Sequence, residues 1–150
     1  MADLDESQRT LFAMAREARA HAYAPYSTLA VGAALRTRDG QIFTGCNVEN
    51  ASFGLTVCAE RVALFAAVSA VGRGELAVEA IAVDAGPGRA ASPCGACRQV
   101  LVEIAPDAVV IWSDGSALRT ASLRALLPEP FEIPSLPRAC ADDRRSGSLD

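Results

Sequence analysis

The sequence predicts an α/β fold in which a mixed sheet of about five strands lies between layers of helices. Segments with the apolar period of a helix alternate along the chain with short apolar segments that suit strands. Asp39-Gly40 separates two of these short segments and is a strong signal for a two-residue hairpin turn. The segment 76–84 is an almost continuous apolar run, as expected for a strand that is covered on both faces.

The turn and helix-stop residues place the boundaries of the expected elements. Pro25 is expected to end the first helix, and Gly72 the second. The expected helices cover 7–23, 57–71 and 94–104, with a short last helix capped by Ser122 and running to 127; the expected strands cover 31–38, 41–46, 76–84, 108–112 and 118–120. On the second helix, the residues expected to line one side are Val62, Ala63, Phe65, Ala66 and Ser69.

Composition and charge exclude several classes of protein. The 150 residues have a mass of 15.6 kDa and suit one domain, expected over 1–137, with a disordered tail of charged and small residues over 138–150. A net charge of -4, with no basic patch, argues against a nucleic-acid partner. The sequence has no apolar run of the roughly 18 residues that a membrane span needs, and its start does not resemble a signal peptide. We therefore expect a cytoplasmic protein without a membrane partner.

Two short clusters carry the chemistry: Cys58-Ala59-Glu60-Arg61 and Pro93-Cys94-Gly95-Ala96-Cys97-Arg98. Each cluster opens a predicted helix. Three thiolates can hold a zinc ion and leave its fourth position open, which is typical of a catalytic site. Glu60 follows a presumed ligand by two residues, close enough to move protons of a water that the metal activates. Five cysteines, an odd count, with no secretory signal also favour metal or catalytic thiols over disulfides.

Three thiolates would place excess negative charge on the zinc site, so we expect neighbouring groups that offset this charge. The partial positive charge and free N–H groups of two helix N-termini provide part of this compensation. Arg61 and Arg98 each follow a presumed ligand directly or closely, and are expected to draw electron density from the sulfur atoms.

The Cys94/Cys97 pair alone leaves two interpretations open, a redox pair or half of a structural zinc site. The Cys-Ala-Glu element upstream and the proline before Cys94 change this balance. Together they match the known signature of zinc deaminases, in which a ligand-x-Glu element precedes Pro-Cys-x-x-Cys.

Over residues 20–131 the sequence resembles the small, three-cysteine cytidine deaminases that salvage free pyrimidine nucleosides. The matching motifs are Pro25-Tyr26-Ser27, Val31-Gly32-Ala33-Ala34, Gly45-Cys46-Asn47-Val48-Glu49-Asn50-Ala51-Ser52, Cys58-Ala59-Glu60-Arg61 and Ser92-Pro93-Cys94-Gly95-Ala96-Cys97-Arg98-Gln99-Val100. The resemblance implies a three-layer α/β/α sandwich and a homotetramer with sites shared between subunits. It implies one Zn²⁺ per subunit and hydrolytic deamination of cytidine and 2′-deoxycytidine to uridine and 2′-deoxyuridine, with release of ammonia.

The resemblance also implies a role for each matching position. Cys58, Cys94 and Cys97 would be the zinc ligands, and Glu60 the catalytic proton shuttle. Asn47 and Glu49 would hold the ribose hydroxyls. The alternative is that both are loop residues without a role in binding. The backbone of Ala59 would help to read the pyrimidine edge, and Phe131 would reach a neighbouring subunit's base, with core packing as its alternative.

Two positions depart from the family pattern. Leu29 stands where the family usually has an aromatic residue that encloses the base, so base affinity or selectivity is expected to differ. Phe53 replaces a frequent tyrosine. Outside the predicted site, Cys46 is interpreted as a buried free thiol, Cys140 as incidental and His21 as a helix-surface residue.

Three rival functions remain open at this point. A deaminase of a related cytosine nucleoside, such as the antibiotic blasticidin S, is compatible with Leu29. A non-catalytic zinc-binding homologue would keep the cysteines but would not need Glu60. A redox protein would use Cys94 and Cys97 without zinc.

Overall fold

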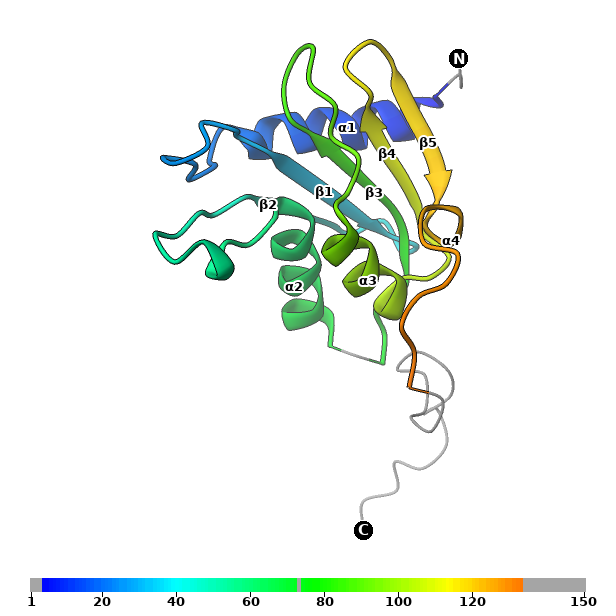
Figure 1. The fold of residues 1–150 in the computed structure, drawn as a ribbon. Coiled ribbons are helices and arrows are strands. Elements are labelled where there is room, and N and C mark those ends of the chain that lie inside the picture. Colours follow the sequence, from blue (N-terminus) through cyan, green and yellow to red (C-terminus); the bar gives the residue numbers. More distant parts are fainter. Residues whose placement is uncertain (1–3, 73, 134–150) are drawn as a thin grey trace.

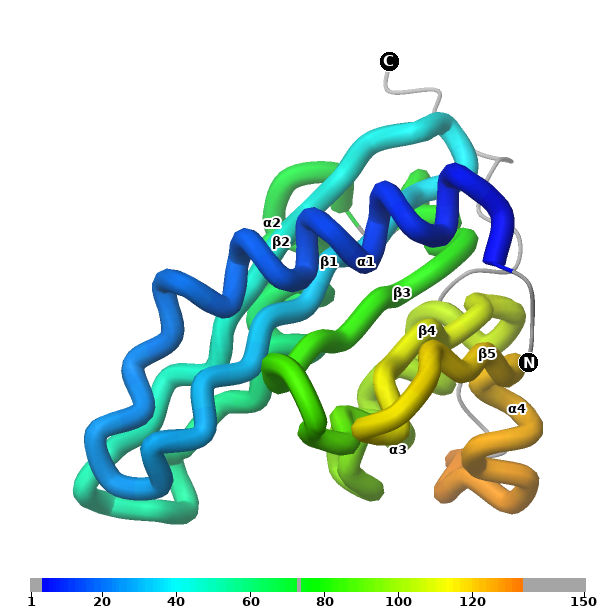
Figure 2. The backbone as a smooth tube through the Cα atoms, turned by 90° about the horizontal axis from the view of Figure 1, so that it is seen from above, coloured from blue at the N-terminus to red at the C-terminus, as the bar shows by residue number. Residues whose placement is uncertain are grey.

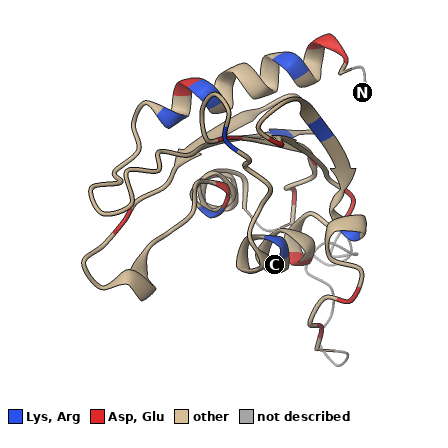
Figure 3. Ribbon diagram, turned by 45° about the horizontal axis from the view of Figure 1, so that its top comes forward, with Lys and Arg blue, Asp and Glu red and all other residues tan. Residues whose placement is uncertain are grey.

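The structure is a computed structural model that describes residues 4–72 and 74–133. The predicted domain boundary at 137, the predicted tail over 138–150 and Cys140 lie outside the described residues. No helix in the described ranges is long and apolar enough to cross a membrane. Acidic and basic residues are interspersed over the elements in Figure 3, and neither sign gathers on one element.

One mixed sheet of five strands runs through the molecule, in the order β2-β1-β3-β4-β5 (Figure 1). Strand β1 (Gly32–Thr37) pairs antiparallel with β2 (Ile42–Cys46) and with β3 (Val78–Asp84). Strand β4 (Val109–Ser113) is parallel to β3 and antiparallel to the edge strand β5 (Leu118–Ser122). All five predicted strands are confirmed; β5 is two residues longer than expected because Ser122 still pairs with Val109.

Helices cover both faces of the sheet, which confirms the three predicted layers. Helix α1 (Glu6–Arg19) crosses one face, as the view from above in Figure 2 shows. Helices α2 (Ala59–Val71) and α3 (Gly95–Ile104) lie side by side on the other face. The short helix α4 (Leu123–Leu126) follows β5 and contacts α3.

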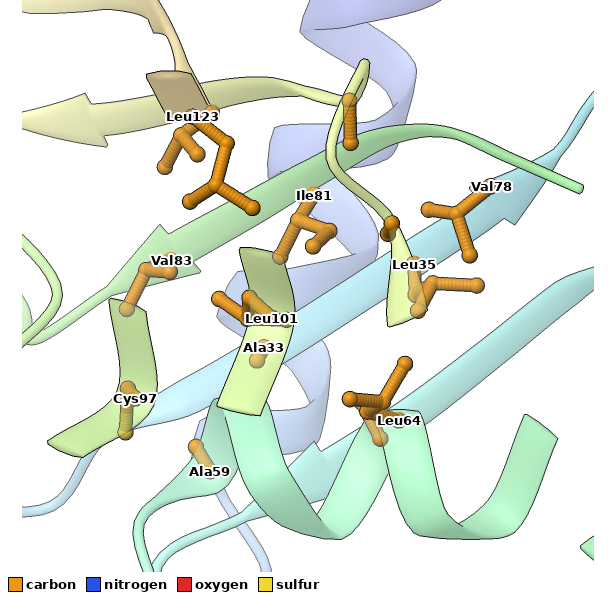
Figure 4. Close-up of a cluster of buried hydrophobic side chains, with 14 of the residues drawn as sticks. Ala33, Leu35, Ala59, Leu64, Val78, Ile81, Val83, Cys97, Leu101 and Leu123 are labelled. Atoms are coloured by element: carbon orange, nitrogen blue, oxygen red, sulfur yellow. The ribbon is translucent and has the colours of Figure 1, made fainter. Parts of the chain in front are cut away.

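Two apolar clusters hold these layers together, one on each face of the sheet. The larger cluster packs α2 and α3 against Leu35 and Ile81, with Leu64 and Leu101 from the helices (Figure 4). These four side chains are fully buried, and burial stabilises each of them by about 1.5–3 kcal/mol. Because successive strand residues point to opposite faces, the alanines between them, such as Ala34, Ala80 and Ala82, face α1 instead.

Small residues allow α1 to approach the sheet closely. A Cβ atom at Gly32 would lie 2.1 Å from the carbonyl oxygen of Ala15, so this strand position accepts glycine alone. The C-terminal end of α1 is further tied to β3 by an ion pair between Arg19 Nε and Asp84 Oδ2, 2.8 Å apart. Close backbone approach and a partly buried ion pair therefore help to fix the layer that α1 forms.

Two predictions about helices are corrected. Helix α1 ends at Arg19, well before the predicted end at 23, because the chain leaves the helix to pair Tyr23 with the segment after β2: Tyr23 N donates to Asn47 O (3.0 Å), and Glu49 N to Tyr23 O (2.8 Å). On α2 the predicted inner side was largely wrong, since Phe65 is 49% exposed. The residues that α2 buries are Ala59, Glu60, Ala63, Leu64 and Ala67.

Candidate active site

Three cysteine side chains that are distant in the sequence meet where α2 and α3 begin. Cys58 is the N-cap residue of α2, Cys94 is the N-cap residue of α3, and Cys97 lies in the first turn of α3. Their Sγ atoms all lie within 4.8 Å of one another, and those of Cys58 and Cys94 are 4.0 Å apart. Cys97 is buried, Cys58 half-buried and Cys94 exposed, so the cluster is closed on the core side and open on the solvent side.

The donor set and its spacing fit zinc. With Zn–S bonds of about 2.3 Å, two sulfur ligands of a tetrahedral site lie roughly 3.8 Å apart, close to the observed Cys58–Cys94 distance of 4.0 Å. Among the described residues the cluster consists of three potential ligands. A three-ligand site leaves one coordination position for water or substrate, as catalytic zinc sites do.

The surroundings of Cys58 and Cys97 shift the pKa values of these two thiols in opposite directions. A hydrogen bond with Cys97 and the contact with Arg61 lower the pKa of Cys58, whereas the same pairing with Cys58, together with burial, raises the pKa of Cys97. We assign the first negative charge to Cys58, because Arg61 Nη2 lies only 3.7 Å from its Sγ atom. The same Arg61 nitrogen donates to the carbonyl of Thr56 (3.3 Å), which holds the guanidinium beside the sulfur.

Arg98 lies beside the cluster but makes other contacts than expected. Its guanidinium donates to the carbonyl of Pro93 (2.8 Å), the carbonyl of Leu126 (2.8 Å) and the hydroxyl of Ser92 (2.9 Å). These contacts hold the loop that leads into Cys94 against the end of α4.

Glu60 lies in the first turn of α2 and is 5% exposed. Burial raises the pKa of its carboxyl group, and the nearby charge of Cys58 adds to this, while a hydrogen bond with Cys97 acts in the opposite direction. A carboxylate whose proton affinity is raised in this way is suited to accept a proton and to return it. Ala59, one residue earlier, is fully buried at the start of the same helix.

Asn47 and Glu49 lie in a second group, formed by the irregular segments before β1 and after β2. Asn47 is buried; its Oδ1 accepts from Val31 N and its Nδ2 donates to Leu29 O, both at 2.8 Å. The carboxylate of Glu49 accepts from the backbone N–H groups of Tyr26 (2.8 Å) and Ser27 (3.2 Å), and from the Ser27 hydroxyl. Both side chains thus bind the segment that carries Leu29.

This second group joins the cysteine cluster through a short bridge. Val48 pairs with Tyr23 on one side and with Val57 on the other, and Val57 directly precedes Cys58. The neighbouring segments also carry exposed apolar side chains: the rings of Tyr26 and Phe53 meet edge to face with centroids 5.7 Å apart, and Leu29 is 38% exposed.

Comparison with known proteins shows the family of the chain. The family model described as the cytidine and deoxycytidylate deaminase zinc-binding region matches residues 5–113. The chain belongs to this family. Zinc is the metal that suits both the family and the three-cysteine cluster.

Individual relatives support the same assignment. A cytidine deaminase of Halalkalibacterium halodurans is 52% identical over 126 residues, which cover 83% of this chain and 93% of the relative. The crystal structure of a cytidine deaminase from Burkholderia pseudomallei has a TM-score of 0.77 at 46% identity and covers 85% of this chain and 100% of its own. A blasticidin-S deaminase of Bacillus cereus is 33% identical over 106 residues, covering 65% of this chain and 74% of that protein.

Sequence reasoning missed three features of the site. Ser27 holds Glu49, as described above. Thr28 has a positive φ of 58° beside Leu29, a conformation that is strained for a β-branched residue. Gln99 contacts the backbone of Phe131, a residue that is 75% exposed. Cys46 is half-buried, not buried as expected, and its Sγ lies 3.3 Å from His21 O, outside the cysteine cluster.

Proposed function

We propose that the protein catalyses the hydrolytic deamination of cytidine and 2′-deoxycytidine to uridine and 2′-deoxyuridine, with release of ammonia, in pyrimidine salvage in the cytoplasm. The observation that carries this proposal is the meeting of three cysteine thiols and one buried glutamate at two helix N-termini. We assign Cys58, Cys94 and Cys97 as the zinc ligands. Lewis-acid activation of the attacking water is the chemistry that the bound zinc supplies.

Glu60 is the proton carrier in this proposal. Its carboxylate takes a proton from the attacking water, delivers one to the ring nitrogen next to the reacting carbon, and helps the amine to leave as ammonia. One residue serves each step because the proton is passed on and not consumed. Burial supports this role, since it raises the pKa of Glu60 above the ordinary value of a carboxyl group and so favours the acceptance of a proton.

Asn47 and Glu49 are proposed to bind the ribose hydroxyls while they keep their contacts to the segment around Leu29. An amide nitrogen carries two N–H groups, and Asn47 uses one of them on Leu29 O. A carboxylate has about four acceptor positions, and three hydrogen bonds occupy Glu49. Both side chains therefore keep bonding capacity for a vicinal diol.

The remaining roles concern charge, the base and assembly. Arg61 compensates thiolate charge at Cys58, and Arg98 braces the loop before Cys94. The backbone of Ala59 reads the pyrimidine edge together with Glu60, and Leu29 gives the base apolar contact without stacking. We propose a homotetramer in which the exposed ring of Phe131 reaches the base in a neighbouring subunit.

A panel of nucleosides tests the function. Cytidine, 2′-deoxycytidine and blasticidin S are assayed by loss of ultraviolet absorbance and by ammonia release, with zinc measured on the same sample. We expect one zinc per subunit and much faster turnover of the two nucleosides than of blasticidin S. Faster turnover of blasticidin S would assign the rival substrate, and stoichiometric zinc without ammonia from any of the three would support a non-catalytic zinc protein.

A further inference from the structure

Gln99 makes a pair of hydrogen bonds that its position on the metal-bearing helix does not require. Its Oε1 accepts from the backbone N–H of Phe131, and its Nε2 donates to the backbone carbonyl of the same residue, both at 2.9 Å. The carboxamide of Gln99 thereby binds both backbone polar groups of Phe131, as a neighbouring β-strand would. We call this pair of hydrogen bonds the clamp. Among side chains of similar length, glutamine carries both a donor group and an acceptor group, whereas a glutamate carboxylate has no donor and methionine has only a weak sulfur acceptor.

The residue that is held in this way leaves its own ring exposed. Phe131 is 75% exposed, so the clamp by Gln99 does not serve to bury an aromatic ring in this subunit. Phe131 also lies in a stretch without regular secondary structure, after α4. In such a stretch a backbone fixed at both polar groups loses conformational freedom before any contact is made, and a partner then binds a prearranged ring.

The clamp also relates Phe131 to the metal cluster. Gln99 follows Cys97 by two residues on α3, and Cys94 is the N-cap residue of the same helix. Arg98 lies between Cys97 and Gln99. Its guanidinium donates to the carbonyl of Pro93, in the loop before α3, and to the carbonyl of Leu126, at the end of α4. One short stretch of α3 therefore holds a sulfur ligand, the loop before it and the segment that presents Phe131.

We infer that Gln99 is a positioning residue for deamination: it fixes the Phe131 backbone to α3 so that the ring meets the base of a nucleoside bound by a second copy of the chain. This inference rests on the proposed function. Gln99 acts through Phe131, because both of these side-chain hydrogen bonds go to the backbone of that residue.

A double-mutant cycle tests the inference, with Gln99→Met, Phe131→Ala and the combined variant. Methionine keeps the length and the apolar contacts of Gln99 and removes the strong hydrogen bonds. We expect Gln99→Met to raise KM for cytidine by about tenfold, the size of effect that the loss of one to two hydrogen bonds gives. The kcat value should change less, zinc content should stay the same, and the combined variant should match Phe131→Ala alone.

Hydrogen exchange and a control on the same helix give readouts besides activity. The amide proton of Phe131 should exchange faster in Gln99→Met than in the wild type, because it loses its acceptor. Glu103→Met, at an exposed position of α3, should leave KM, zinc and that exchange rate unchanged.

Several outcomes would overturn the inference. A multiplicative effect in the combined variant would mean that Gln99 and Phe131 act independently, and a wild-type KM in either single variant would mean that one of them does not contribute. Zinc loss in Gln99→Met would assign Gln99 to the metal site. If the wild type releases no ammonia from any cytosine nucleoside, the proposed function fails and the positioning role with it, while hydrogen exchange still reports whether the clamp itself exists.

Discussion

The cysteine cluster adjoins the segments that contain Asn47 and Glu49, because Val57, which precedes Cys58, pairs with Val48. The two regions are nevertheless stabilised by different kinds of contact. The cysteines are placed by the starts of two helices, whose backbones are fixed by their own hydrogen bonds and by burial against the sheet. The segments before β1 and after β2 have little regular structure and are held by side chains, above all Asn47 and Glu49.

The two regions should therefore respond differently to the loss of a side chain. In the cysteine cluster the helix backbones are held by their own hydrogen bonds, so removal of the Cys97 side chain should leave them intact. Cys94 differs, because its Sγ atom also caps α3 by accepting from the backbone N–H of Cys97 (3.5 Å). In the second group the side chains proposed to bind ribose also hold the backbone, so their removal changes binding and local stability together. Substitutions at the cysteine cluster and Glu60 should therefore mainly change zinc content or turnover. Substitutions in the second group should change KM and stability together.

The largest effect is expected from Cys97→Ala. This change removes the buried sulfur of the cluster, and zinc measured per subunit should fall from one to near zero, with loss of deamination. Cys46→Ala is the matched control, since its thiol lies against His21 O and not in the cluster. Full zinc in Cys97→Ala, or equal zinc loss in both variants, would show that the cluster is not the metal site.

Glu60→Gln should lower kcat by about 10²–10⁴, the contribution typical of a general acid–base residue. Zinc content should stay at the wild-type level, and stability should not fall, because a buried carboxyl group whose pKa is raised is replaced by a neutral amide of the same shape. Glu103→Gln, an exposed glutamate on α3, serves as the control. Wild-type kcat in Glu60→Gln would remove Glu60 from the mechanism.

The helix-borne part of the site is the part that the sequence predicted best. Cys58, Cys94 and Cys97 lie in short motifs at helix starts, and helix N-termini can be located from local sequence. The strands were also predictable, because the apolar run of β3 and the turn at Asp39-Gly40 are local signals. In both cases the residues that determine the structure are close together in the chain.

The remaining features depend on contacts between distant residues. The end of α1 is set by pairing of Tyr23 with Asn47 and Glu49, which no local periodicity records. The inner side of α2 was mispredicted because this helix is apolar on several sides, so that periodicity alone does not choose between them. The contacts of Arg98 with Leu126 join residues 28 positions apart in the chain.

Asn47→Ala should damage the second region in both respects. It leaves Val31 N–H and Leu29 C=O without their partner, and each lost hydrogen bond costs about 1 kcal/mol. We expect the free energy of unfolding to fall by about 2 kcal/mol, measured in urea, together with a raised KM for cytidine and unchanged zinc content.

Asn50→Ala is the control for this prediction. Asn50 is exposed and its Oδ1 accepts from Ser52 N (2.8 Å), so its loss should change stability and KM much less. If Asn47→Ala raised KM at wild-type stability, Asn47 would be a ligand without a structural role, and the contrast between the two regions would not hold at this residue.

The smallest effect is expected from Ser27→Ala, and it depends on pH. The Ser27 hydroxyl is the main cause that lowers the pKa of Glu49 below its ordinary value. A lowered pKa in the folded state contributes stability above the ordinary pKa and loses it as the pH falls through the folded value. Ser27→Ala should therefore be slightly less stable than the wild type at pH 7, and this difference should shrink below about pH 4.

Ser7→Ala separates this stability effect from substrate binding. The Ser7 hydroxyl donates to Asp5 Oδ1 (2.6 Å) and lowers the pKa of that carboxyl group in the same way, at the exposed start of α1. Urea unfolding of both variants at pH 7 and pH 3.5 should give the same direction of pH dependence, and any release of zinc by acid affects both alike. Only Ser27→Ala should raise KM for cytidine at pH 7, because only there does the hydroxyl hold a carboxylate that is proposed to bind ribose. Equal KM values in the two variants would mean that Ser27 stabilises its segment without orienting Glu49 for the substrate.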